Sequence, residues 1–186
     1  MVGSSKLERA VWLLNKILFI CTGNTCRSIM AEGFFNAAVK EEPLLSKHFT
    51  ASSAGVMAIN GDSASPNSIQ SLRDDWGIDI SSHQAKLIEH DDIRDAYLVL
   101  TMTRKHKDAI IRLFPKVKSK IYTLKEYAER KNIKEYFGKN IADDYDFTLD
   151  VLDPYGMTIQ IYKQCACDIK IAIDKILERL KQEFNT

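Results

Sequence analysis

Hydrophobic and polar positions along the chain follow two kinds of pattern. Short continuous apolar runs, at 16–21 (KILFIC) and 97–102 (YLVLTM), predict buried strands of a parallel sheet. Between them lie stretches with an apolar side chain at every third or fourth position, which predict helices that bury one face. The clearest is a long C-terminal helix, whose apolar positions are Tyr162, Ala166, Ile169, Ile173, Ile176 and Leu180.

The same patterns predict further strands at 49–54 and 120–123, and further helices at 28–39, 66–76 and 104–114. Strands that alternate with helices imply a mainly parallel sheet that is covered on both faces. The sequence therefore predicts an α/β fold, with a twisted four-stranded sheet and helices on both sides.

The chain of 186 residues fits one domain. We expect a short N-terminal leader at 1–15 and a single domain at 16–186, with a polar, poorly periodic surface excursion at about 129–149. The leader loosely resembles a signal peptide, but Asn15 and Lys16 interrupt its apolar run and no small-residue cleavage site follows. Export is therefore not expected.

Composition narrows the function classes. A net charge of +1 gives no reason to expect nucleic acid or a membrane surface as partner. Four cysteines in a chain of this length form no disulfide framework, and their spacing matches no zinc motif. We expect a reducing, cytoplasmic location and no metal. Cys165 and Cys167 lie two positions apart on a helix, do not face each other, and are predicted to be packing residues.

The most informative segment is CTGNTCRS at 21–28, which follows a predicted strand and precedes a predicted helix. Gly23 and Asn24 tolerate left-handed backbone conformations, so the loop can turn its N–H groups inward. Those donors and the positive end of the next helix make an anion site at the carboxyl end of the strand, where parallel sheets bind ligands. The Walker pattern of nucleotide-binding loops is absent.

Three side chains give this anion site a chemistry. Arg27 carries a planar fork suited to two phosphoryl oxygens. Cys21 would lie at the floor of the loop, where the field that holds an anion also favours the thiolate. Ser28 can donate a hydrogen bond to that thiolate.

This loop, together with Asp153-Pro154-Tyr155 far along the chain, resembles the low-molecular-weight protein tyrosine phosphatase family. The resemblance implies a flavodoxin-like fold of the phosphotyrosine phosphatase I type. It also implies that Cys21 is the nucleophile, that Arg27 binds the phosphoryl oxygens, and that Asp153 is the general acid. Such an enzyme works through a phosphocysteine intermediate, needs no cofactor, and releases inorganic phosphate from phosphorylated protein substrates.

The resemblance extends to the residues around the nucleophile. It implies a supporting hydrogen-bond network of Asn24, Ser28, Ser53 and His83, while the other histidines (His48, His90 and His106) lie outside any motif and are expected at the surface. The family usually has proline where this chain has Ile29. The implied phosphate-binding loop consists of Thr22, Gly23, Asn24, Thr25, Cys26, Arg27 and Ser28.

Within the family, the chain looks most like the bacterial protein-arginine phosphatase branch. Tyrosine-directed members usually carry a bulky aliphatic residue where this chain has Thr25, and a threonine hydroxyl suits a polar, cationic guanidinium better than an extra methyl group does. Tyr155 can flank either substrate. The strings that resemble the branch are SAGV (53–56), MTRKHK (102–107), TLKEY (123–127), DVLDPYG (150–156) and IQIYKQ (159–164).

Three other functions are alternatives to phosphoarginine hydrolysis. The first is hydrolysis of phosphotyrosine by the same site. Arsenate reductases share the fold and nucleophile but need resolving cysteines, and none lies between Cys26 and Cys165. A silent phosphopeptide-binding module would lose the thiol or the acid, and both are present.

A second cysteine in the loop suggests redox control. Cys26 lies across the loop from Cys21, and a thiolate is the form that peroxide oxidises. We expect a Cys21–Cys26 disulfide that inactivates the enzyme reversibly. The alternative is that Cys26 is a small packed side chain.

Overall fold

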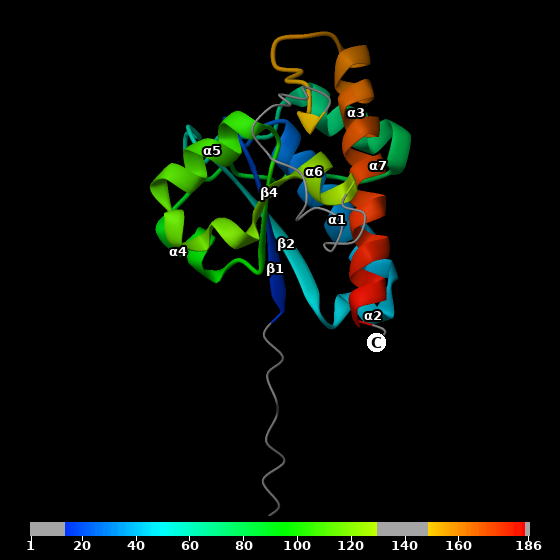
Figure 1. The fold of residues 1–186 in the computed structure, drawn as a ribbon. Coiled ribbons are helices and arrows are strands. Elements are labelled where there is room, and N and C mark those ends of the chain that lie inside the picture. The colour runs from blue at the N-terminus through cyan, green and yellow to red at the C-terminus, as the bar shows by residue number, and fades with distance from the viewer. Residues whose placement is uncertain (1–13, 130–148, 185–186) are drawn as a thin grey trace, which may run out of the picture.

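The computed structural model describes residues 14–129 and 149–184. The leader and the excursion at about 129–149 lie almost wholly outside these residues. Four parallel strands form one sheet in the order β2-β1-β3-β4 (Figure 1). The strands are β1 (Asn15–Cys21), β2 (Phe49–Gly55), β3 (Leu98–Thr101) and β4 (Ile121–Thr123).

The predicted helices are all present. They are α1 (Arg27–Glu41), α3 (Pro66–Trp76), α5 (Arg104–Leu113) and α7 (Ile159–Phe184). The pattern missed several short helices, because four to six residues are too few to establish a period. They are α2 (Pro43–Ser46), α4 (His90–Asp95), the 3-10 helix η1 (Pro115–Lys120) and α6 (Leu124–Glu129).

Helices cover both faces of the sheet, as predicted (Figure 1). Side chains of β1 alternate between the faces, because successive residues of a strand point to opposite sides. Ile17, Phe19 and Cys21 belong to the larger core, which includes residues of α1, α3, α6 and α7. Leu18 and Ile20 belong to a smaller core with residues of α4 and α5. Cys21 therefore lies on the face that α1 covers.

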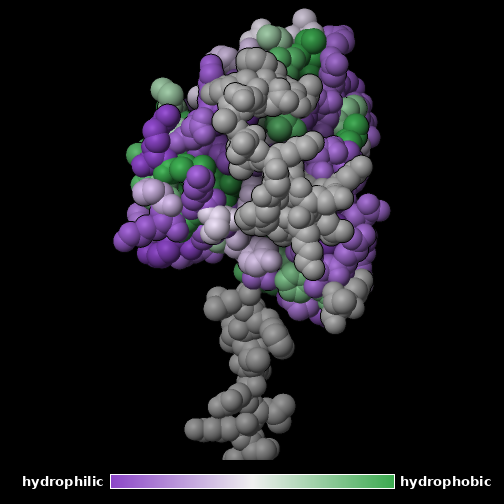
Figure 2. Space-filling view, in the orientation of Figure 1, coloured by the Kyte–Doolittle hydropathy of each residue, from purple (hydrophilic) through white to green (hydrophobic). Residues whose placement is uncertain are grey.

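Aromatic rings pack the larger core. The rings of Phe19 and Phe35 meet edge to face with their centroids 6.0 Å apart, and the ring of Phe34 packs against that of Trp76 with a centroid distance of 5.0 Å. These contacts fix α1 against the sheet and against the end of α3. On the outside, the face seen in Figure 2 is mainly hydrophilic in its described part, and hydrophobic residues form only small groups. None of the helices in the described part of the chain is long and apolar enough to cross a membrane.

The long helix α7 places its two cysteines differently. Cys165 is buried, as expected of a packing residue, whereas Cys167 is exposed. The expectation for Cys167 was wrong, because a step of two residues turns the helix by about 200° and carries the side chain to the outer face.

Two isoleucines of α7 test how the helix is held. Ile169 is fully buried in the larger core, and Ile171 is 57% exposed. We expect Ile169→Ala to lower the free energy of unfolding by about 2–5 kcal/mol, because it leaves a cavity in the core. Ile171→Ala should change it by less than about 0.5 kcal/mol. Urea denaturation of both variants makes the comparison, and equal losses would contradict the packing.

Candidate active site

The segment 21–28 forms a loop between β1 and α1, at the carboxyl edge of the sheet. Cys21 is the last residue of β1, lies opposite Gly55 of β2, and is 2% exposed. Asn24 takes a left-handed conformation with φ of 58°, alone among the described non-glycine residues. The sequence predicted that tolerance for Gly23 and Asn24, but Gly23 has no positive φ in the structure. The loop thus turns at Asn24.

Gly55 of the neighbouring strand lies directly against the loop, and no pattern in the sequence singles out this glycine. A Cβ on Gly55 would lie 2.5 Å from the carbonyl oxygen of Thr22 and 2.9 Å from the amide nitrogen of Asn24. Val56 and Met57 donate backbone hydrogen bonds to the carbonyls of Cys21 and Thr22 at 3.0 and 2.9 Å. The backbones therefore approach so closely that only glycine fits at position 55.

The sulfur of Cys21 lies among hydrogen-bond donors. The backbone N–H of Asn24 points at the sulfur at 3.2 Å, and the hydroxyl oxygen of Ser28 lies 3.0 Å from it. Donors that converge on a sulfur stabilise the thiolate over the thiol. The arrangement suits a nucleophile that must stay ionised.

The side chain of Asn24 sets the direction of these hydrogen bonds. Its Oδ1 accepts from the backbone N–H of Lys86 at 2.8 Å, so its Nδ2 must be the donor to Ser28 at 2.9 Å and to Ser53 at 2.7 Å. Since Ser28 Oγ accepts from Asn24, its single hydroxyl proton is left to point at Cys21. The backbone of Lys86 thus orients a proton at the sulfur of Cys21.

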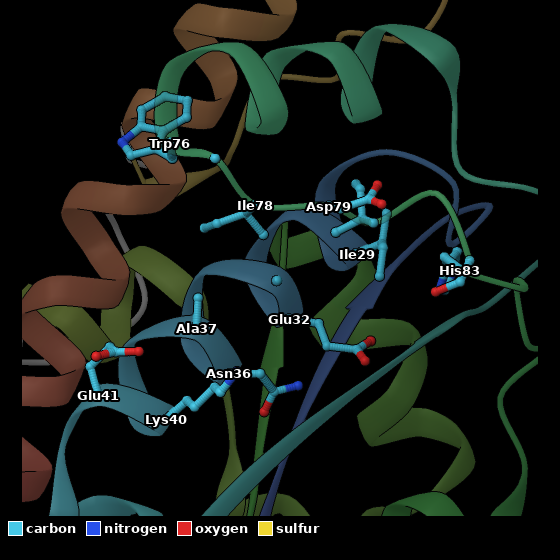
Figure 3. Close-up of a pocket in the computed structure, with 14 residues that line it drawn as sticks. Ile29, Glu32, Asn36, Ala37, Lys40, Glu41, Trp76, Ile78, Asp79 and His83 are labelled. Atoms are coloured by element: carbon cyan, nitrogen blue, oxygen red, sulfur yellow. The ribbon is translucent and has the colours of Figure 1, made fainter.

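The other end of this chain of hydrogen bonds is a carboxylate. Ser53 donates its hydroxyl proton to Glu32 at 2.6 Å, and burial raises the pKa of Glu32 above its ordinary value in spite of this bond. His83 donates from Nε2 to the carbonyl of Asn24 at 2.7 Å. Glu32 and His83 both line a groove of about 720 Å³ between α1 and the segment 76–83 (Figure 3). Sequence reasoning found Ser53 and His83 but missed Glu32.

Arg27 and Asp153 meet across the mouth of the loop. Arg27 is 4% exposed, and it donates to the carbonyl of Val151 at 3.3 Å and to Asp153 at 2.5 Å. Its Nε is buried and bonds to none of the described residues. A buried donor without a partner is costly. A phosphoryl group on the sulfur would supply the missing acceptor.

A tight turn presents Asp153. Its Oδ1 accepts from the backbone N–H of Tyr155 at 3.2 Å, and Met157 donates its N–H to the carbonyl of Pro154 at 2.9 Å. Gly156 has φ of 75°, which a type II turn requires at its third residue. Half of the Asp153 side chain remains exposed, so the acid faces the open side of the loop.

His106 was expected at the surface and is instead 8% exposed beside the loop, so that expectation was wrong. Its Nε2 lies 2.9 Å from the hydroxyl of Thr22, and its Nδ1 lies 2.9 Å from that of Thr103. Burial, and secondarily the charge of Arg27, lower the pKa of His106 to about 4, so the ring is neutral at physiological pH. The helical step from His106 to buried Ile110 was the signal available in the sequence.

Cys26 is the N-cap residue of α1 and is 5% exposed. Its sulfur lies 3.4 Å from the hydroxyl of Tyr162, and burial raises the pKa of that tyrosine to about 12. Cys21 and Cys26 are both free thiols in the structure. The disulfide between them stays a prediction.

The loop opens into a pocket of about 280 Å³. Thr25 lies on its wall and is partly buried, and Tyr155 stands at its rim with 76% of its side chain exposed. The described residues contain no group of three or more histidine, cysteine or acidic side chains able to hold a metal ion. The pocket is lined by Cys21, Thr22, Gly23, Thr25, Cys26, Arg27, Met57, Ile59, Asp62, Asp153 and Tyr155.

Comparison with known proteins agrees with this geometry. Residues 16–186 match the family described as low molecular weight phosphotyrosine protein phosphatase. The chain belongs to this family, as its resemblance predicted, and is a phosphatase with a single-domain α/β fold.

Three relatives illustrate the range within the family. The protein-arginine-phosphatase of Bacillus subtilis is 32% identical over 90% of this chain and 97% of its own. The YwlE arginine phosphatase from Geobacillus stearothermophilus superposes with a TM-score of 0.75 at 33% identity, covering 91% of this chain and 94% of that one. A low molecular weight protein tyrosine phosphatase from T. tengcongensis has a TM-score of 0.74 at 40% identity, and the match covers 89% of this chain and 99% of that one. The relatives therefore include proteins named arginine phosphatases and a protein named tyrosine phosphatase.

The close contact at Gly55 can be tested directly. Gly55→Ala should displace the backbone of the loop, because its Cβ would meet backbone atoms, and we expect kcat/KM on an aryl phosphate to fall about 100-fold. Gly33→Ala is the matched control, since the three atoms nearest to its Cβ would be side-chain methyl groups of Ile80, Leu72 and Ile78 and not backbone atoms. Steady-state kinetics, with circular dichroism to verify folding, measure both. A fully active Gly55→Ala enzyme would show that the loop tolerates a shift.

Proposed function

We propose that the protein is a cysteine-dependent protein-arginine phosphatase, which hydrolyses phosphoarginine in proteins and releases inorganic phosphate. The observation that carries the phosphatase chemistry is the convergence of Asn24 and Ser28 on the sulfur of Cys21, with Arg27 and Asp153 at the mouth of the same pocket. The preference for phosphoarginine is supported by Thr25 on the pocket wall and by the similarity to two proteins named arginine phosphatases.

In the first step the substrate enters with its phosphoryl group over Cys21. The phosphoryl oxygens compete with Asp153 for Arg27 and take up the unpartnered Nε, which releases the carboxylate of Asp153 toward the leaving group, where it takes up a proton from solvent. The sulfur attacks phosphorus, the bond from phosphorus to the leaving nitrogen breaks, and Asp153 gives its proton to that nitrogen. The product is a phosphocysteine.

In the second step water replaces the leaving group. Asp153, now ionised, takes a proton from the water as it attacks phosphorus, and the sulfur–phosphorus bond breaks. The sulfur leaves as a thiolate, which the hydroxyl of Ser28 and the amide of Asn24 stabilise. When phosphate leaves, Asp153 gives its proton to solvent and pairs with Arg27 again, which restores the free enzyme.

Hydrolysis of phosphotyrosine is the second candidate. Tyr155 stands exposed at the rim, beside Met57 and Ile59 of the same pocket, and these side chains can pack against an aromatic ring. Arsenate reduction is less well supported. Burial raises the pKa of Cys165 to about 12, so its thiol is a poor resolving nucleophile.

The acid assignment predicts a dependence on the leaving group. Asp153→Asn should lower kcat by roughly 10²- to 10⁴-fold on substrates with poor leaving groups, because no proton reaches the departing atom. The loss should shrink on an activated aryl phosphate, whose leaving group needs no protonation. Steady-state kinetics on a series of phosphate esters measure the trend. Full activity of the variant on a poor leaving group would exclude Asp153 as the acid.

The substrate preference depends on Thr25. Thr25→Ile replaces a hydroxyl by carbon and adds a methyl group beside the reacting atoms, which crowds a guanidinium and favours an aromatic ring. A change of this size in a pocket alters selectivity by roughly 10- to 200-fold. We expect the ratio of kcat/KM for phosphoarginine to that for phosphotyrosine peptides to fall by this amount. An unchanged ratio would remove the main physical support for phosphoarginine.

A further inference from the structure

We propose that Asp62 is a further specificity-determining residue of this pocket, which favours a guanidinium leaving group over a phenol. The inference rests on the proposed arginine phosphatase function. Asp62 lies on the loop after β2 and lines the same pocket as Cys21, Thr25 and Asp153.

The backbone of Asp62 is anchored at both of its polar groups. Its N–H donates to the carbonyl of Ile59 at 3.2 Å, and its carbonyl accepts from Ala85 at 2.7 Å. The preceding Gly61 has φ of 91° and donates to the carbonyl of Ala85 at 2.9 Å, which reverses the chain at this point. The loop therefore holds position 62 at the pocket wall without using its side chain.

Two carboxylates line the pocket, and they differ in whether they are already bonded to another side chain. Asp153 is bonded to Arg27 in the free enzyme and must move a proton during catalysis. The carboxylate of Asp62 is bonded to none of the described residues, and the side chain is exposed. Asp62 is thus the pocket carboxylate that is free to contact the substrate.

Phosphoarginine carries a cationic group with N–H donors that this carboxylate can bind, and phosphotyrosine does not. The guanidino group of phosphoarginine is cationic when the substrate binds; when the bond from phosphorus to nitrogen breaks, its electron pair stays on nitrogen, Asp153 supplies one proton, and arginine leaves as a guanidinium cation. The leaving group therefore carries positive charge from binding to release, together with N–H donors that match a carboxylate. A phenol develops no positive charge and carries no N–H, and the carboxylate only adds repulsion toward the phosphoryl group.

The test compares two isosteric variants, each of which removes one negative charge. Asp62→Asn removes it from the pocket wall. Asp108→Asn is the matched control, because Asp108 is exposed on α5, outside the pocket, and bonded to none of the described residues. For each protein, kcat/KM is measured on a phosphoarginine peptide and on a phosphotyrosine peptide of the same flanking sequence, at low and at high salt.

We expect Asp62→Asn to lower kcat/KM for phosphoarginine by about 3- to 10-fold, to leave the value for phosphotyrosine unchanged or higher, and to lose part of its effect at high salt. Asp108→Asn should leave kcat/KM unchanged for both substrates. Equal effects of Asp62→Asn on the two substrates would overturn the role of Asp62 and leave the proposed function standing. A wild-type enzyme that hydrolyses phosphotyrosine but not phosphoarginine would overturn both.

Discussion

The orientation of one amide group governs the chemistry of this site. Asn24 is held in a left-handed conformation and accepts a hydrogen bond from the backbone of Lys86, so its two amide protons must go to Ser28 and Ser53. Every later proton position follows from that choice, because each serine has only one proton to give. The proton of one serine goes to Cys21 and that of the other to Glu32. The phosphatase loop is therefore fixed by backbone geometry outside the loop.

In the proposed mechanism, the ion pair of Arg27 and Asp153 links substrate binding to proton transfer. In the free enzyme the cation holds the acid, while a buried guanidinium nitrogen keeps an unused donor. A phosphoryl group satisfies that donor and frees the carboxyl in one event. The pair thus holds Arg27 and Asp153 in place when no ligand is bound, and binding of a phosphoryl group would separate them.

The sequence predicted the strands, the longer helices and most of the site, because these leave local signals. Apolar runs and helical periods are local, and the loop at 21–28 and the Asp153 segment carry recognisable residue orders. What it missed depends on contacts between distant segments. Nothing near Gly55 indicates that Thr22 passes 2.5 Å from its absent side chain. Glu32 and His106 look like ordinary helix residues until the fold places them against Ser53 and Thr22.

Arg27 and Asp153 meet across 126 residues of chain. Closing so long a segment costs conformational entropy that only the finished packing of α7 and the sheet can offset. Arg27 and Asp153 therefore have no local contacts that would bring them together in a nascent or partly unfolded chain. Such a chain carries the thiol without its catalytic partners. In the proposed mechanism, hydrolytic competence is thus a property of the completed tertiary structure rather than of any one segment of the chain.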